Sequence, residues 1–233
     1  MKIALLGYGK MGKAIEAIAL NRGHEIVLKT SQAVTSKITI ADIAIDFSIP
    51  NAAFNNISNC INNNVTVISG TTGWLEDYNK ITSLCEEKKG AFIYASNFSL
   101  GVNIFFELNK TLAKMMSTLE NYKVDIEEIH HTQKLDAPSG TTISLAKDII
   151  TNNANYSSWQ LDGNAKKVLP ITAKRVENVP GTHNITYKSN VDTIKLEHIA
   201  HNREGFALGA IVAAEWLLGK TGVYTMKDVL NIG

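Results

Sequence analysis

The sequence is poor in cysteine: only Cys60 and Cys85 occur among its 233 residues. Two thiols cannot build a disulfide framework or a four-cysteine zinc site, and neither has a histidine or cysteine neighbour at metal-ligand spacing. We therefore expect two buried thiols and no metal.

The chain also lacks a charge excess and a long apolar run. It has 23 Lys and Arg against 22 Asp and Glu, a net charge of +1, so we expect no global attraction to nucleic acid or to an anionic membrane. The first apolar run, residues 3–6, is too short for a signal-peptide core. No stretch approaches the roughly 20 apolar residues of a membrane span. We expect a cytoplasmic protein with small-molecule partners.

What is present is typical of a folded enzyme. An apolar share of 45% with 19% charged residues is that of an ordinary globular protein. Up to residue 98, short apolar runs alternate with segments of helical periodicity. The expected strands are residues 3–6, 24–29, 43–48, 65–69 and 91–95. Such alternation favours a parallel sheet covered by helices on both faces.

The pattern changes after residue 98. Helical periodicity spans 102–119 and 141–150, and period-two alternation spans 124–129. Two alternating runs, 185–190 and 192–199, predict a hairpin. These features indicate a smaller α+β unit with an antiparallel or mixed sheet, and a last helix is expected over 206–218. Residues 152–158 are polar enough to predict a surface excursion.

A glycine run follows the first expected strand and opens the first helix. Gly7, Gly9 and Gly12 have the G-x-G-x-x-G spacing of a dinucleotide fingerprint, in which the glycines permit a tight turn and close approach of pyrophosphate. The helix N-terminus adds free N–H groups. An ordinary glycine turn is the alternative. The predicted coenzyme contacts here are Gly7, Tyr8, Gly9, Lys10, Met11 and Gly12.

The second expected strand ends without an acidic residue. A fold that prefers NAD usually has Asp or Glu there to bind the adenosine ribose. This chain has Lys29 instead, followed by Thr30 and Ser31, so NADPH should be accepted, with Lys29 contacting its 2′-phosphate. A solvated lysine is the alternative, and the preference between NADH and NADPH stays open.

Two further loops follow the fourth and fifth strands, at the sheet edge where parallel sheets bind ligands. Either loop taken alone could be a plain turn. Their small and amide residues nevertheless suit contact with a nicotinamide ring. The predicted contacts are Gly70, Thr71, Thr72, Ala95, Ser96, Asn97 and Phe98.

The densest group of reactive residues lies at 127–141. His130, His131 and Lys134 precede Ser139, Gly140 and Thr141, which open a helix. Proton donors thus lie beside an anion-binding helix terminus, an arrangement that suits a carboxylate substrate. Structural histidines, a solvated lysine and a simple N-cap are the separate alternatives.

Residues 130–141 resemble the signature E-x-H-H-x-x-K-x-D-A-P-S-G-T of the bacterial 4-hydroxy-tetrahydrodipicolinate reductases, also called dihydrodipicolinate reductases. The likeness extends over essentially the whole chain. It includes the glycine fingerprint and the segments 46–48, 70–73, 95–102 and 206–210.

The resemblance implies reduction of 4-hydroxy-tetrahydrodipicolinate to tetrahydrodipicolinate by NADH or NADPH, in lysine and diaminopimelate biosynthesis. It implies His130 and Lys134 as catalytic residues, His131, Ser139, Gly140 and Thr141 as contacts of a dicarboxylate heterocycle, and a homotetramer built through the second sheet. It also implies a Rossmann-type domain at 1–98, a substrate and oligomerisation domain at 99–205, and a helix at 206–233 that returns to the first domain.

Two alternatives remain. Another two-domain NAD(P)-dependent amino-acid dehydrogenase or imine reductase could share the glycine run, but we would not expect it to repeat residues 130–141. A non-catalytic nucleotide-sensing protein could keep the glycine loops, but it would have no need of both His130 and Lys134.

Overall fold

The computed structural model of the chain describes residues 1–32, 36–202 and 204–232. Its contacts divide the chain into two compact units. The first consists of Met1–Leu100 and Glu204–Gly233, and the second of Gly101–Arg203.

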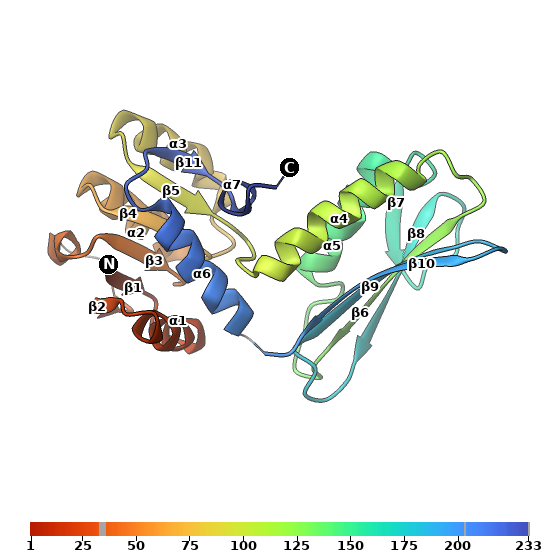
Figure 1. Cartoon of the computed structure of the whole chain (residues 1–233), viewed down its shortest axis with the longest axis horizontal. Helices are drawn as coiled ribbons and strands as arrows, with labels where there is room; N and C mark the ends of the chain where they lie inside the picture. The colour runs from red at the N-terminus through yellow and green to blue at the C-terminus, as the bar shows by residue number, and fades with distance from the viewer. Residues whose placement is uncertain (33–35, 203, 233) are drawn as a thin grey trace. The chain divides into compact units, whose positions relative to one another are not determined.

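The first unit is built on a six-stranded parallel sheet, which confirms the predicted Rossmann-type architecture (Figure 1). The strand order is β11-β5-β4-β3-β1-β2. The strands are β1 (Lys2–Leu6), β2 (Glu25–Thr30), β3 (Ile43–Asp46), β4 (Thr66–Ser69), β5 (Ala91–Tyr94) and β11 (Gly222–Tyr224). Because all strands run the same way, the loops that follow them meet at one edge.

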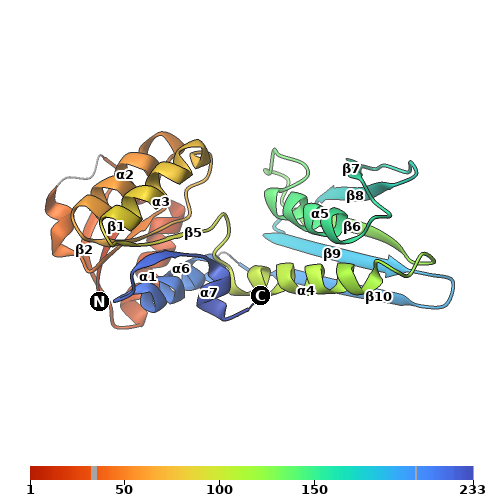
Figure 2. The ribbon, with the colours of Figure 1, turned by 90° about the horizontal axis from the view of Figure 1, so that it is seen from above.

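Helices cover both faces of this sheet (Figure 2). Ile3 and Leu5 of β1 pack toward one face, and Ala4 and Leu6 toward the other. The first face is covered by α1 (Lys10–Asn21), α6 (Glu204–Leu217) and α7 (Met226–Leu230). The second is covered by α2 (Pro50–Asn62) and α3 (Tyr78–Glu87). Two short 3-10 turns complete the unit, η1 (Ser36–Ile40) and η2 (Leu75–Asp77).

The second unit has a five-stranded mixed sheet in the order β10-β9-β6-β8-β7. Its helices are α4 (Leu100–Met116), which begins in the first unit, and α5 (Gly140–Asn152). Its strands are β6 (Lys123–His130), β7 (Ser158–Leu161), β8 (Val168–Arg175), β9 (Gly181–Lys188) and β10 (Thr193–Ala200). β9 pairs antiparallel with β6 and β10, whereas β6, β7 and β8 are parallel.

One face of the mixed sheet carries the core of the second unit. Alternate residues of β6 point inward, and Val124 and Ile126 join a cluster with apolar side chains of α4 and α5. The same alternation then places Glu128 and His130 on this buried face. The inner face therefore changes from apolar to ionisable toward the carboxyl end of β6.

The structure differs from the expected elements in two segments. The region after residue 152 contains the strands β7 and β8, which the sequence pattern did not indicate. β8 alternates buried Leu169 and Ile171 with half-buried Val168 and Pro170, and a proline in the run lowers its strand signal. The short elements β11 and α7 were also not predicted. The expected hairpin is present as β9 and β10, closed by a hydrogen bond from Ser189 N–H to Asp192 C=O.

None of the helices in the described part of the chain is long and apolar enough to cross a membrane.

The close approach of α6 to the chain near Phe98 generates a stability test. A Cβ on Gly209 would lie 1.8 Å from the carbonyl oxygen of Phe98. We expect Gly209→Ala to lower the free energy of unfolding by about 2 kcal/mol or more, because backbone must move to relieve the clash. Gly205→Ala in the same helix is the control, since its nearest neighbour is Ser99 Oγ at 3.7 Å. Equal unfolding midpoints in urea for both variants would contradict this packing.

Candidate active site

The turn after β1 requires glycine at its first position. Gly7 has φ +93°, and a Cβ on it would lie 2.1 Å from the carbonyl oxygen of Phe47. The Gly7 N–H donates to the Thr30 carbonyl at 2.8 Å. This bond joins the ends of β1 and β2, so the glycine turn lies at the shared carboxyl edge of the sheet.

Two cavities meet at this turn. One, of about 680 Å³, is lined by Gly7, Tyr8 and Gly9 together with Ser31, Gln32, and residues of the β3–α2 loop and α2. The other, of about 350 Å³, is lined by Gly9 again and by five further predicted contacts: Lys10, Met11, Gly70, Thr71 and Thr72. The expected nicotinamide coenzyme fits this arrangement, because the cavities border both the glycine turn and the loop after β4.

Other predicted coenzyme residues do not line these cavities. Lys29 bonds to Glu16 of α1, with 3.0 Å between Nζ and Oε1.

The predicted contacts after β5 do not line the cavities either. Phe98 is buried and packs against the ring of Phe47 at a centroid distance of 5.8 Å. Asn97 Oδ1 accepts from the Ser99 N–H. Ala95 donates its N–H to Ser69, Ser96 is exposed, and Gly12 packs against the carbonyl of Gly7.

Asp46 at the end of β3 holds the loops around the smaller cavity. Its fully buried carboxylate accepts from Ser48 Oγ at 2.6 Å, Ser69 Oγ at 2.8 Å and Thr71 Oγ1 at 2.7 Å. Asn56 Nδ2 of α2 adds a fourth bond at 3.1 Å. One buried side chain thus connects the carboxyl ends of β3 and β4 and orients Thr71.

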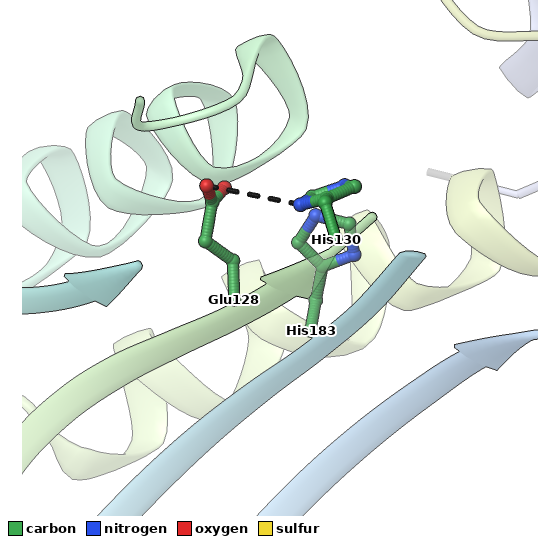
Figure 3. A group of neighbouring side chains, drawn as sticks. All are labelled: Glu128, His130 and His183. Atoms are coloured by element: carbon green, nitrogen blue, oxygen red, sulfur yellow. Dashed lines mark ion pairs between the residues drawn. The ribbon is translucent and has the colours of Figure 1, made fainter. Parts of the chain in front are cut away.

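A second buried carboxylate organises the other unit. Glu128 of β6 is fully buried, and its Oε2 accepts from Ser139 N–H at 2.8 Å and from Thr142 Oγ1 at 2.7 Å. Its Oε1 lies 3.7 Å from Nδ1 of His130 (Figure 3). Burial opposes ionisation, but the facing His130 ring and the hydrogen bonds from Ser139 and Thr142 outweigh it and hold the pKa of Glu128 far below its ordinary value.

Arg175 completes this arrangement from β8. Its guanidinium lies 3.3 Å from Oε1 of Glu128, and it donates to the carbonyl oxygens of Lys134 at 3.3 Å and Asp136 at 2.7 Å. A fourth bond reaches the carbonyl of Lys174. Arg175 therefore ties the loop between β6 and α5 to the buried carboxylate.

The hydrogen-bond pattern determines which nitrogen of His183 carries the proton. Ser139 Oγ donates to Thr142 Oγ1 and accepts from the Thr142 N–H. Its only hydrogen is therefore used, so His183 Nε2, at 3.3 Å, must donate to it. Burial, followed by the neighbouring His130, lowers the pKa of His183 to about 4, so its ring is neutral at pH 7.

His130 packs edge-on against His183, with ring centroids 5.1 Å apart. Its Nδ1 is buried and has no hydrogen-bond partner in the described chain, while the Glu128 carboxylate faces it. A negative oxygen facing Nδ1 favours a proton on that nitrogen, which leaves Nε2 as the exchanging position when the ring is neutral.

Three of the four predicted substrate contacts lie at the start of α5. Ser139 is the N-cap, and the N–H groups of Gly140 and Thr141 have no acceptor in the described chain. His131 lines a separate cavity of about 600 Å³, whose other walls come from residues 132–133, 177–180 and 201–202.

Lys134 forms a bidentate pair with Asp136, with Nζ 2.7 and 2.8 Å from the two carboxylate oxygens. Asp136 is largely exposed, and the hydrogen bond from Lys134 lowers its pKa. Such an exposed pair opens at little cost, so the ammonium is available to a bound anion.

Glu128, His130 and His183 also have the ligand types of a metal site, with one donor atom of each within 4.8 Å of the others. The guanidinium of Arg175 contacts the same oxygen of Glu128 that faces His130. A divalent cation bound there would be repelled by this fixed positive charge. The cluster is therefore better explained as a charge-assisted hydrogen-bond network.

Comparison with known proteins identifies the family. Residues 1–98 match the family model described as "Dihydrodipicolinate reductase, N-terminus", and residues 101–230 match "Dihydrodipicolinate reductase, C-terminus". The chain is 57% identical to the 4-hydroxy-tetrahydrodipicolinate reductase of Christiangramia forsetii, over 99% of this chain and 98% of that one. The chain belongs to the dihydrodipicolinate reductase family.

More distant relatives agree. The 4-hydroxy-tetrahydrodipicolinate reductase of Neisseria gonorrhoeae is 31% identical over 93% of this chain and 84% of its own. Dipicolinate-bound dihydrodipicolinate reductase from Paenisporosarcina sp. TG-14 has the same fold, with a TM-score of 0.82, 23% identity and 97% coverage of both chains.

Membership of the dihydrodipicolinate reductase family confirms the predicted activity. The chain is an oxidoreductase that uses NADH or NADPH to reduce 4-hydroxy-tetrahydrodipicolinate, in lysine and diaminopimelate biosynthesis.

Sequence reasoning assigned no role to Glu128, His183, Arg175 or Asp46. A signal existed for Glu128, because period-two alternation places it on the same face as His130. Arg175 could not be assigned to the site from the sequence, because the strand that carries it was not predicted. In this dihydrodipicolinate reductase it lies opposite His130 in the β6–β8 register.

The buried charge of Glu128 generates a pH-dependent prediction. Glu128→Gln should lower the free energy of unfolding by about 3–5 kcal/mol at pH 7, because Arg175 loses its buried counter-charge. Since folding lowers the pKa of Glu128, this stabilisation is present above its ordinary value of 4.5 and is lost as the pH falls below it. The difference from wild type should therefore shrink in acid.

Glu127→Gln is the matched control for urea unfolding at several pH values. Glu127 is the preceding residue of β6, points to the opposite face and pairs with the half-exposed Lys174. Glu127→Gln should lower the free energy of unfolding by less than about 1 kcal/mol. A difference for Glu128→Gln that does not change with pH would show that folding leaves the pKa of Glu128 at its ordinary value, which contradicts the account.

Proposed function

We propose that this reductase binds its substrate as a dicarboxylate at the N-terminal end of α5 and protonates it from His130. The observation that carries the proposal is the group of Ser139, Gly140 and Thr141 beside His130, held together by one buried carboxylate.

Carboxylate binding is supported by the donors left over at α5. Glu128 takes the N–H of Ser139 and the Ser139 hydroxyl takes the N–H of Thr142, so the N–H groups of Gly140 and Thr141 remain for a ligand. The helix N-terminus also contributes a positive dipole end. The related Paenisporosarcina reductase is bound to dipicolinate, a dicarboxylate, which is consistent with this choice of ligand. His131, which lines the separate cavity, is proposed as a substrate contact on the family resemblance alone.

His130 is proposed as the proton donor. When bound, the reduced nicotinamide supplies the hydride. Loss of water from the 4-hydroxy substrate gives a conjugated imine. Hydride addition to this imine leaves negative charge on the substrate, which a proton from Nε2 of His130 neutralises. The Glu128 carboxylate stabilises the protonated imidazole and holds the ring by facing Nδ1.

Lys134 is proposed as the second catalytic group. In the free protein its ammonium is neutralised by Asp136. A substrate carboxylate competes with Asp136 for the three N–H donors, so binding brings the positive charge to the substrate. The clamp of Arg175 on the carbonyl oxygens of Lys134 and Asp136 fixes the loop from which Lys134 reaches.

The homotetramer expected from the resemblance stays a prediction, as does the cytoplasmic location. The outward face of β6, β9 and β10 is available for assembly in this proposal, and its side chains are largely polar, as in Asp125, Thr186 and Lys195.

The proposal is tested by following oxidation of NADH and of NADPH with the condensation product of pyruvate and aspartate semialdehyde. We expect turnover by the wild type with at least one coenzyme. His130→Gln and Lys134→Met should each lower kcat by about 10²- to 10⁴-fold, the range of general acid catalysis. Coenzyme binding without substrate should change less than about twofold.

Lys110→Met serves as the matched control, because Lys110 pairs with Glu107 and Asp148 away from the start of α5. It should retain wild-type kcat. Full turnover by His130→Gln, or parallel loss of coenzyme binding in both variants, would contradict the proposed roles.

A further inference from the structure

The cavity of about 680 Å³ beside the glycine turn has an uncharged lining. Its walls combine Tyr8, Ser31 and Gln32 with a row of asparagines on α2: Asn51, Asn55, Asn56 and Asn59. None of the described residues that line it is charged at neutral pH. Ser31 and Gln32 follow β2, where a Rossmann-type sheet binds the adenosine ribose.

The charged residue nearest in sequence to Ser31 and Gln32 is Lys29, and its ammonium already forms an ion pair with Glu16. Lys29 Nζ lies 3.0 Å from Glu16 Oε1 and 5.0 Å from the centroid of the Tyr8 ring. The Tyr8 hydroxyl donates to the other carboxylate oxygen of Glu16. The hydrogen bond from Tyr8, followed by that from Lys29, lowers the pKa of Glu16. The pair is therefore fully charged and its net charge is zero.

We infer that Glu16 of α1 makes this reductase favour NADH over NADPH by cancelling the charge of Lys29. The inference rests on the proposed function, in which the adenosine half of the coenzyme occupies this cavity. The two coenzymes differ only in the 2′-phosphate, which carries between one and two negative charges at pH 7. A ribose diol needs only uncharged partners, and Ser31 and Gln32 can supply them.

Movement of Lys29 would not remove this effect. The ion pair is partly exposed, with 44% of the Lys29 side chain accessible, so breaking it costs little. If Lys29 turned toward a 2′-phosphate, the Glu16 carboxylate would stay behind without its counter-charge. The phosphate would then meet one positive and one negative group in place of a single cation.

The end of β2 has no acidic residue of its own, but Glu16 of α1 brings a carboxylate to Lys29 of β2. The usual carboxylate at that position binds the ribose hydroxyls directly. Glu16 acts through Lys29 and is therefore a positioning residue, set 13 positions earlier in the chain.

The experiment measures dissociation constants of NADH and NADPH by titration calorimetry without substrate, together with kcat/KM for each coenzyme. For wild type we expect NADH to bind at least about tenfold more tightly. Glu16→Gln keeps the bond with Tyr8 but frees the charge of Lys29. It should tighten NADPH binding about 3- to 10-fold, the effect of one partly screened unit charge, and leave NADH binding within about twofold.

Three further variants isolate the cause. Glu215→Gln removes a comparable carboxylate, which pairs with Arg22 on the surface, and should leave both constants unchanged. Lys29→Met leaves the Glu16 carboxylate without its counter-charge and should weaken NADPH binding about 3- to 10-fold in wild type. Adding Lys29→Met to Glu16→Gln should abolish the gain.

Tighter binding of NADPH than of NADH by wild type, equal binding of the two, or no gain from Glu16→Gln would overturn the inference. A loss of NADPH affinity in Lys29→Met of about 30-fold or more would overturn it too, because that exceeds the effect of one uncompensated charge and Lys29 would then be the phosphate ligand. Failure of the folded protein to bind either coenzyme is a separate result and would contradict the proposed function itself.

Discussion

The second unit depends on a single buried negative charge. Glu128 has no exposed surface, yet it is joined to a β6 histidine, to the first turn of α5 and to a β8 arginine. A carboxylate can be kept ionised in such a place only if several donors surround it. Those donors include the first turn of α5, which is proposed to bind the substrate. The cost of burying the charge is thus offset by hydrogen bonds from α5 and by the charge of Arg175, which also holds the loop bearing Lys134.

Asp46 has the corresponding position in the first unit, where it is a buried carboxylate surrounded by hydrogen-bond donors. Both carboxylates lie at or near the carboxyl end of a strand, and both accept hydrogen bonds from a nearby loop: Asp46 from Thr71 after β4, and Glu128 from Ser139 before α5. Loops at a sheet edge are otherwise free to move. Each buried acid converts them into a shaped surface: Thr71 is fixed beside the smaller cavity, and Ser139 caps α5. In this chain, a buried carboxylate orders the loops beside each of the two candidate binding surfaces.

Sequence reasoning succeeded where the information is local. The glycine turn and the 130–141 segment are each continuous in the chain. The change from continuous apolar strands to alternating strands was enough to predict a parallel sheet followed by a second sheet. It failed where partners are distant in sequence. Arg175 is 47 residues from Glu128 in the sequence. It lies on β8, whose strand signal in the sequence is weakened by Pro170. The position of Lys29 was noted correctly, but the direction of its side chain depends on Glu16, and no spacing rule encodes that pairing. Substrate and coenzyme contacts remain predictions for the same reason.

The central claim is that the Glu128 carboxylate sets the orientation and protonation of His130. Nitrogen-15 NMR of histidine-labelled protein tests it most directly, with the His130 signal assigned by its absence from His130→Gln. The account predicts that neutral His130 carries its proton on Nδ1, facing Glu128, whereas His183 carries its proton on Nε2, facing Ser139. A neutral His130 protonated on Nε2 with a bare Nδ1 would contradict it.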